Sequence, residues 1–236
     1  LLMQELREPA NYFAVLKAVA HGKTRLNEIT QTAGFHDRSA ASRYLDILRD
    51  LGLIQRLAPV TEKQPHKSRR GIYRLKDQFL RFWFRFVYPH RSELEEGEGE
   101  RVLETRIKPY FPEFVGLVFE GICRRHLRLL GRQGKLPFYP SRIGSWWDGK
   151  NEIDVLAISE DESAILAAEC KWWVKPVGAN VLAGLQHKIK AVLPLFERPP
   201  QIFYALFARS GFTEELQEEA GKQQNILLVN ASEFHL

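Results

Sequence analysis

Two apolar runs of strand length lie between Trp146 and Trp173, and they constrain the fold more than any other feature of the chain. The first run includes Ile153 to Leu156, and the second extends from Ala164 to Lys171. The residues between them, 159–163, are polar and typical of a turn. The pattern therefore indicates two strands that pair as a hairpin.

Three charged residues interrupt these apolar runs. Asp154 lies in the first run, and Glu169 and Lys171 lie at the end of the second. Strand side chains alternate between faces, so Glu169 and Lys171 point to one side while Cys170 points into the packing. If the strands pair, Asp154 reaches the same place. Such a group is either a metal-dependent site for cleaving phosphodiesters or a buried ion pair. Two acids with one lysine leave buried negative charge uncompensated, which favours metal binding.

The composition is that of a folded protein with a substantial core. Of 236 residues, 44% are hydrophobic and 27% are charged, enough for one large domain or two ordinary ones. No apolar run approaches the roughly 18 residues of a membrane span, so no membrane partner is expected. The two cysteines lack zinc-ligand spacing and favour a reducing, cytoplasmic location. A net charge of +5 is compatible with a polyanionic partner. Because the chain begins with Leu1, we expect it to be part of a longer polypeptide.

The first 75 residues have the pattern of three short helices followed by two strands. The helices are predicted over 11–21, from Thr24 to Gly34 and from Asp37 to Leu51, with Thr24 and Asp37 as N-caps. The strands are predicted over 53–57 and 71–75, with a basic loop at 62–70 between them. This arrangement resembles a winged helix-turn-helix domain, with the third helix as the reading helix and the loop as the wing.

That resemblance implies a set of residues that contact DNA. They are short or basic side chains on the third helix and in the wing, suited to groove and phosphate contacts. The predicted nucleic-acid-binding residues are Arg38, Ser39, Ser42, Arg43, Lys67, Arg69 and Arg70. Alternatively, these faces are merely solvated and the module docks a neighbouring domain.

An aromatic segment and an acidic segment follow. Residues 78–89 are unusually aromatic and predict a helix packed at a domain interface, with its arginines facing out. Residues 91–101 are acidic and contain glycine, which is typical of a linker. The predicted domains are therefore 1–90 and 102–236, joined by a linker at 91–101.

The second domain has the order helix, three strands, helix, strand, helix, strand. Its long first helix is predicted from Pro112 to Leu130, and its last strand at 226–229. This order indicates an α/β sandwich around a mixed sheet, so the whole chain combines α/β and α+β architecture.

The order of elements, with Asp154 followed by Glu169 and Lys171, resembles the PD-(D/E)xK nuclease superfamily. Ile153 stands where that superfamily commonly has proline. The resemblance extends to Glu120 on the first helix and Gln186 on the helix after the lysine.

The resemblance implies a role for each of these residues. Asp154, Glu169 and the backbone carbonyl of Cys170 would bind Mg²⁺ or Mn²⁺, with Glu120 as a further carboxylate. Lys171 would orient the attacking water or neutralise phosphate charge. Gln186 would position the nucleophile or a phosphate.

A narrower resemblance covers nearly the whole chain. It is carried by the run 82–89, by Gly116 and Phe119-Glu120, by the segment with Trp146-Trp147 and Glu152 to Val155, and by Glu169 to Trp172. These segments are similar to the C-terminal region of a family of archaeal and bacterial P-loop ATPases of the AAA+ type. In that family an ATPase domain is followed by a winged helix and a nuclease-like domain of uncertain function. This chain has no Walker A sequence, so the resemblance implies an ATPase domain upstream of Leu1.

Three hypotheses follow. The first is a divalent-metal-dependent DNA endonuclease or exonuclease module, delivered by the winged helix and driven by an upstream ATPase. The second is a nuclease fold that binds duplex or branched DNA, or mediates assembly, without cutting. The third is a winged-helix transcription regulator. The aromatic segment and the sheet edge are candidate interfaces of a homo-oligomer.

Overall fold

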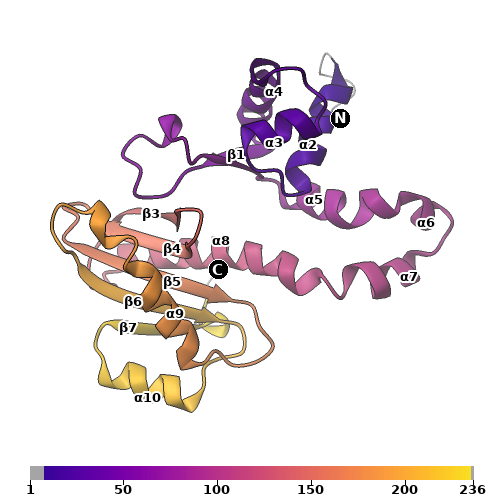
Figure 1. The fold of residues 1–236 in the computed structure, drawn as a ribbon. Helices are drawn as coiled ribbons and strands as arrows, with labels where there is room; N and C mark the ends of the chain where they lie inside the picture. Colours follow the sequence, from indigo (N-terminus) through magenta and orange to yellow (C-terminus); the bar gives the residue numbers. More distant parts are fainter. Residues whose placement is uncertain (1–7, 235–236) are drawn as a thin grey trace. The chain divides into compact units, whose positions relative to one another are not determined.

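The computed structural model describes residues 8–234 (Figure 1). Within them the chain divides into two compact units. The first consists of residues 8–58 and 64–109, and the second of residues 59–63 and 110–234. No helix among the described residues is both long and apolar enough to cross a membrane.

The first unit begins with the three predicted helices and two predicted strands. They are α2 (Pro9–Ala20), α3 (Leu26–Thr32), α4 (Arg38–Asp50), β1 (Ile54–Leu57) and β2 (Ile72–Leu75). The strands pair antiparallel. Apolar side chains at helical spacing on the three helices, among them Leu16, Ile29 and Leu45, form one buried core with residues of both strands. The predicted elements of this region are confirmed.

The two predicted N-caps differ in outcome. Asp37 caps α4, since its carboxylate accepts a hydrogen bond of 2.8 Å from the backbone N–H of Ala40. The prediction for Thr24 is wrong because α3 begins one residue later, after Arg25. The Glu28 carboxylate accepts from the backbone N–H groups of Thr24 and Arg25, at 3.1 and 3.0 Å, and takes over the capping role.

The aromatic segment is helical but irregular. It comprises α5 (Gln78–Phe82), a π-helical turn η2 (Trp83–Val87) and a 3₁₀ turn η3 (Tyr88–His90). Trp83, Phe84 and Tyr88 surround Phe13 of α2, with ring centroids 5.1 to 6.2 Å from it. These aromatic rings therefore complete the core of the first unit.

The acidic segment is structured, unlike the predicted linker. It contains α6 (Arg91–Glu95) and α7 (Gly99–Val102), continues into a π-helical turn η4 (Leu103–Ile107), and buries Val102 fully. Ion pairs one helical turn apart, such as Arg91 with Glu95 at 3.2 Å, offset its acidic charge. The division between the two units falls after residue 109 and not within 91–101.

The second unit contains a five-stranded mixed sheet. Its elements are α8 (Phe111–Arg132), β3 (Pro140–Trp147), β4 (Glu152–Ser159), β5 (Ala164–Lys171), α9 (Ala179–Ile189), β6 (Gln201–Ala208), α10 (Glu214–Lys222) and β7 (Ile226–Asn230). The strand order follows the sequence from β3 to β7. The β3–β4 and β4–β5 pairs are antiparallel, and the β5–β6 and β6–β7 pairs are parallel. The predicted mixed sheet and the hairpin of β4 and β5 are confirmed.

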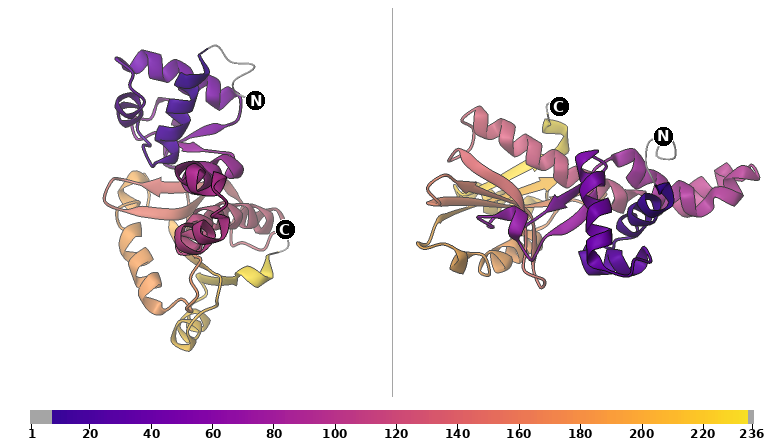
Figure 2. Two further views of the ribbon diagram at one scale, coloured as in Figure 1. Left: turned by 90° about the vertical axis from the view of Figure 1, so that its right-hand side faces the viewer. Right: turned by 90° about the horizontal axis from the view of Figure 1, so that it is seen from above.

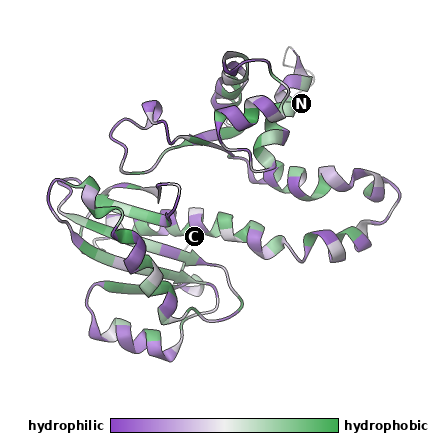
Figure 3. Cartoon of the chain, in the orientation of Figure 1, coloured by the Kyte–Doolittle hydropathy of each residue, from purple (hydrophilic) through white to green (hydrophobic). Residues whose placement is uncertain are grey.

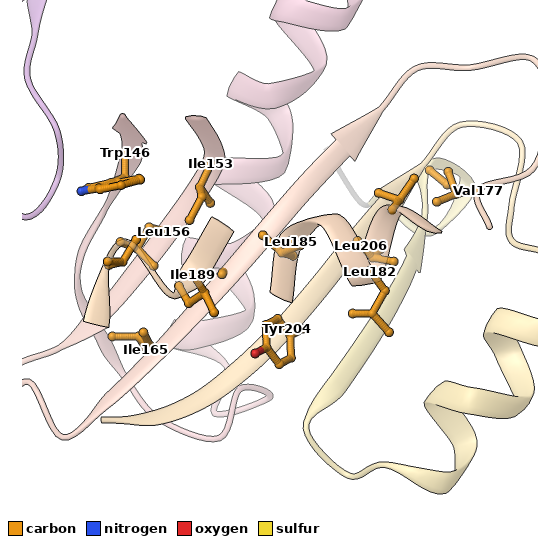
Figure 4. Packing of buried hydrophobic residues seen from close by; sticks show 14 of the residues in the cluster. Trp146, Ile153, Leu156, Ile165, Val177, Leu182, Leu185, Ile189, Tyr204 and Leu206 are labelled. Atoms are coloured by element: carbon orange, nitrogen blue, oxygen red, sulfur yellow. The ribbon is translucent and has the colours of Figure 1, made fainter. Parts of the chain in front are cut away.

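Helices α8 and α9 cover opposite faces of this sheet (Figure 1, Figure 2). On the α9 face, Leu185 and its helical neighbours pack against Ile165 and Ala167 of β5 (Figure 4). On the α8 face, Phe119 and Cys123 belong to a core that includes Ala168 and Cys170 of β5. Apolar residues run along the central strands, whereas α10 is largely hydrophilic (Figure 3). The sheet is thus a layer between two cores, as predicted.

A bulge interrupts β4 beside Asp154. Gly144 of β3 pairs with Leu156, but Trp146 pairs with Ile153, so β4 advances by three residues where β3 advances by two. Ile153 and Leu156 consequently both belong to the α9-side core, although regular alternation would place them on opposite faces. A bulge of this kind redirects the side chain at its centre.

Candidate active site

The carboxylates of Asp154 and Glu169 meet at one ammonium group. Lys171 Nζ donates to Asp154 Oδ2 at 3.4 Å and forms an ion pair with Glu169 Oε2. Asp154 Oδ2 also accepts a hydrogen bond of 2.8 Å from the backbone N–H of Cys170. The three side chains predicted to converge at the ends of β4 and β5 therefore do so.

A fourth charged group, Lys188 of α9, completes the cluster. Its Nζ lies 2.7 Å from Glu169 Oε1, so Glu169 is held by a lysine on each carboxylate oxygen. With two acids and two lysines, the cluster has no formal excess of negative charge. The expectation of uncompensated negative charge is thus wrong, because a helix distant in sequence supplies the second cation.

Burial and mutual repulsion shape the protonation of this cluster. Only 3% of the Glu169 side chain and 15% of the Asp154 side chain are exposed. Burial, followed by the negative charge of Glu169, raises the pKa of Asp154 to about 6, against the opposing effect of Lys171. For Lys171, burial opposes the charged form, but Asp154 and Glu169 outweigh it and raise the pKa of the ammonium group.

Two further side chains hold the bulge that carries Asp154. Ser145 Oγ of β3 donates to the backbone carbonyl of Asp154 at 3.0 Å. Arg124 of α8 donates to Ser145 Oγ at 2.7 Å and lies 3.5 Å from the same carbonyl. This chain of hydrogen bonds links α8, β3 and β4 directly behind the acid. It fixes the backbone from which the Asp154 side chain projects.

Cys170 lies on the other face of the sheet, as predicted. Its side chain belongs to the α8-side core, where burial and a hydrogen bond with Cys123 raise the pKa of the thiol. The side chain of Cys170 therefore packs, while its backbone N–H serves Asp154.

Gln186 does not join the cluster, and Glu120 lies on α8, the helix that covers the Cys170 side of the sheet. Besides burial, the negative charge of Glu120 is one of the causes that raise the pKa of Cys170. Gln186 lines a pocket with Lys190 and Tyr204. Because a helix turns about 100° per residue, Gln186 and Lys188 point in nearly opposite directions from α9. Lys188, and not Gln186, is the residue of this helix that contacts the acids.

The carboxylates of the cluster are suited to a divalent metal ion. Carboxylate oxygens are the hard ligands that Mg²⁺ and Mn²⁺ prefer, and those of Asp154 and Glu169 already converge on one cation, the Lys171 ammonium. These two residues fit such an ion. Among residues 8–234, no group of three or more His, Cys, Asp or Glu side chains is close enough together to hold a metal ion.

The residues predicted to contact nucleic acid lie in the first unit. Arg38, Ser39 and Arg43 of α4 are exposed, although Ser39 Oγ donates to the capping carboxylate of Asp37 at 2.6 Å. Ser42 is half-buried.

In the loop between β1 and β2, Lys67 and Arg69 are exposed and Arg70 is half-buried. Arg56 of β1 holds this loop by donating to the carbonyl oxygens of Pro65 at 2.7 Å and Ser68 at 2.6 Å. The basic side chains of the loop are thus presented from an anchored backbone.

Sequence reasoning missed Lys188, Ser145 and Arg124. Lys188 lies at helical spacing from the buried Leu185 and Val181, which places it at the edge of the buried stripe of α9. From the sequence alone, that spacing marks Lys188 as a residue able to reach the sheet. Ser145 and Arg124 gave no such signal, because their roles depend on a bulge that the apolar pattern of β4 does not reveal.

Parts of this chain are similar to known archaeal and bacterial proteins. Residues 83–179 match a family described as archaeal and bacterial proteins of unknown function, and this range includes Asp154, Glu169 and Lys171. An uncharacterised protein of Methanocaldococcus jannaschii is 37% identical over 172 residues. That alignment covers 73% of this chain and 38% of the archaeal protein. The chain thus spans well under half the length of the curated relative it matches.

Proposed function

We propose that this chain is a DNA-binding module with a divalent-metal-dependent phosphodiesterase site, and that it forms part of a larger ATPase. The fold proposed for its two units is a winged helix and a PD-(D/E)xK nuclease-like domain. One observation carries the proposal: the carboxylates of Asp154 and Glu169 both meet the ammonium group of Lys171 at the adjacent ends of β4 and β5.

Each residue of this cluster has a role that its contacts support. A bound Mg²⁺ or Mn²⁺ supplies a Lewis acid for the phosphate and lowers the pKa of an attacking water. Asp154 and Glu169 would hold the ion, and the hydrogen bond from Cys170 N–H orients Asp154 for this. Lys171 would move from the carboxylates toward the phosphate and neutralise charge that develops on it. Lys188 would hold the Glu169 carboxylate in position.

The larger setting rests on the sequence resemblance and on the partial coverage of the archaeal relative. In this proposal, α4 and the loop between β1 and β2 contact DNA with Arg38, Arg43, Lys67 and Arg69. An ATPase domain outside this chain would move the DNA or control access to the site.

The test is cleavage of labelled duplex and branched DNA with Mg²⁺ or Mn²⁺. Asp154→Ala and Lys171→Ala should each reduce the rate at least about 100-fold, since each removes a group that acts on the reacting phosphate. Lys190→Ala is a matched control, because this exposed lysine at the C-cap of α9 lies outside the cluster. Cleavage that survives both site variants would identify a contaminating nuclease and reject the proposal.

Lys188 favours a second candidate function, a nuclease fold that binds DNA without cutting. Two lysines already satisfy both oxygens of Glu169, so the cluster is charge-balanced without an added cation. Binding to DNA without cleavage in either metal would support this candidate. Protection of one specific DNA sequence would instead support a transcription regulator.

A further inference from the structure

An exposed tryptophan lies directly beside the charged cluster. Trp173 follows β5 and is 46% exposed, and the next residue, Val174, is also exposed. The indole ring centroid of Trp173 lies 5.9 Å from Lys171 Nζ, the same atom that contacts Asp154 and Glu169. The ring therefore borders the site that holds both acids.

The alternation of β5 continues beyond its last residue and sorts the two adjacent tryptophans. Trp172 follows Cys170 to the α8 face, where its ring centroid is 5.1 Å from that of Phe119. Trp173 follows Glu169 and Lys171 to the other side and stays exposed. The two tryptophans at the outer ends of the hairpin region therefore differ: Trp146 is buried in the α9-side core, and Trp173 is exposed.

The backbone at Trp173 is anchored. Ser210 Oγ donates to the Trp173 carbonyl at 2.8 Å, and the backbone N–H of Arg209 donates to the Lys171 carbonyl at 3.1 Å. These bonds join the segment after β5 to the segment after β6. An exposed aromatic ring held on a fixed backbone loses little conformational entropy when it binds a ligand.

Two lysines accompany Trp173. Lys171 Nζ lies 5.9 Å from the Trp173 ring centroid, and Lys175 follows two residues later in the sequence. An aromatic surface among cations is suited to an unpaired nucleobase whose strand carries phosphates. A paired base stacks on its neighbours in a duplex and does not offer its face.

We propose that Trp173 stacks on an unpaired nucleobase of a DNA strand and positions that strand beside Asp154, Glu169 and Lys171. This inference rests on the proposed function, since it specifies that the site takes single-stranded or unpaired DNA. It is tested by binding in the absence of metal, so that its outcome does not depend on cleavage.

The experiment uses the full 236-residue chain, a chelator and a labelled single-stranded DNA oligonucleotide, with fluorescence anisotropy as the readout. Trp173→Ala should weaken binding about 5- to 150-fold, the change that corresponds to ~1–3 kcal/mol of base stacking. Trp173→Phe should bind within a few-fold of the wild type, because phenylalanine also stacks. Tyr139→Ala is a matched control, since Tyr139 is 65% exposed in the same unit and lies outside the cluster.

Tryptophan fluorescence gives a second readout on the same proteins. Binding of the oligonucleotide should quench part of the emission of the wild type, and Trp173→Phe should lose that part while it still binds. Equal affinity of wild type and Trp173→Ala would overturn the proposal. Absence of oligonucleotide binding by the wild type would also overturn the proposal. It would instead favour a protein segment as the partner that packs on Trp173.

The outcomes separate this inference from the proposed function. Trp173-dependent binding without cleavage would leave the stacking role standing and reject the phosphodiesterase. The opposite result is cleavage that Asp154→Ala abolishes, with neither cleavage nor binding changed by Trp173→Ala. That result would support the phosphodiesterase and reject the stacking role of Trp173.

Discussion

At the scale of single residues, Lys188 determines the charge balance of the candidate site. Glu169 is almost fully buried and depends on a lysine at each of its carboxylate oxygens. A buried carboxylate that loses a charged partner is costly, because desolvation is no longer offset by the ion pair. Lys188 is 32% exposed, so solvent screens part of this effect.

Lys188→Ala is therefore predicted to lower the free energy of unfolding by about 1–3 kcal/mol. Urea denaturation at neutral pH measures it. Gln186→Ala on the same helix should change stability by less than about 0.5 kcal/mol, since Gln186 lies away from the cluster. Equal effects of the two substitutions would contradict the role assigned to Lys188.

The raised pKa of Asp154 predicts that the stability of the protein depends on pH. Its folded-state pKa of about 6 lies above the ordinary aspartate value of about 3.9. Between these pH values the folded state binds the proton more tightly than the unfolded state does. The stability contributed by this group is therefore fully present below about pH 4 and is lost as pH rises through 6.

The measurement is the free energy of unfolding of wild type and Asp154→Asn between pH 4 and 8. The difference, wild type minus variant, should fall mainly between pH 4 and 6 and level off at higher pH. Asp161→Asn serves as the control. Hydrogen bonds from Ser163, followed by Ser159, lower the pKa of Asp161, so this substitution should leave the slope between pH 4 and 6 unchanged. A flat difference for Asp154→Asn would show that its carboxyl is not perturbed.

At the scale of elements, the β4 bulge places the first acid. With regular alternation along β4, Ile153 and Leu156 would lie on opposite faces. Both lie on the α9 face because the register shifts between them. The carbonyl at the bulge is satisfied by Ser145, which Arg124 holds in turn. A side chain on β3 thus controls the geometry of an acid on β4.

Two serines of β3 allow a matched test of this arrangement. Ser145 donates to the carbonyl of Asp154, and Ser141 donates to the carbonyl of Ile158 at 3.2 Å, away from the cluster. Each Ser→Ala substitution should cost ~1–2 kcal/mol of stability. Only Ser145→Ala should shift the NMR resonances of Asp154 and Lys171. Similar spectra of both variants around the cluster would show that the Ser145 hydrogen bond does not position the acid.

At the scale of the whole molecule, each of the two units has its own core. The cores on the two faces of the five-stranded sheet draw their buried members from residues 110–234, with Val60 packed at the edge of one of them. The core of the first unit draws its buried members from residues 12–84. Each unit therefore buries its apolar surface largely by itself.

A fragment of residues 110–236 is predicted to fold cooperatively without the first unit. The fragment also lacks residues 59–63 of the second unit. Loss of the partly exposed Val60 side chain and of the hydrogen bond from its N–H to the Ser145 carbonyl should cost only ~1–2 kcal/mol. Calorimetry of the full chain should then resolve two transitions, one of them close to that of the fragment. A fragment that unfolds without a cooperative transition would contradict the independence of the second unit.

The sequence was informative wherever local pattern decides structure. Period-two alternation was enough to place Glu169 and Lys171 on one side of β5 and Cys170 on the other, because strand geometry fixes that relation. Helical spacing likewise predicted α2, α4 and α8, and the order of elements predicted the mixed sheet. The acidic segment 91–101 was predicted to be a linker because its composition is typical of one. Its ion pairs at helical spacing support helices instead.

Only the tertiary structure decided which distant residues join the site. The sequence by itself determined that Asp154, Glu169 and Lys171 are able to meet, since they lie on two adjacent strands of one hairpin. The packing of α9 on the sheet brought Lys188, and not Gln186, to Glu169, and a bulge opposite Ser145 directed Asp154. Spacing along α9 marks Lys188 as an edge residue but does not tell which charge it meets. Spacing along β4 likewise does not reveal the bulge, because the bulge depends on how β3 and β4 pair.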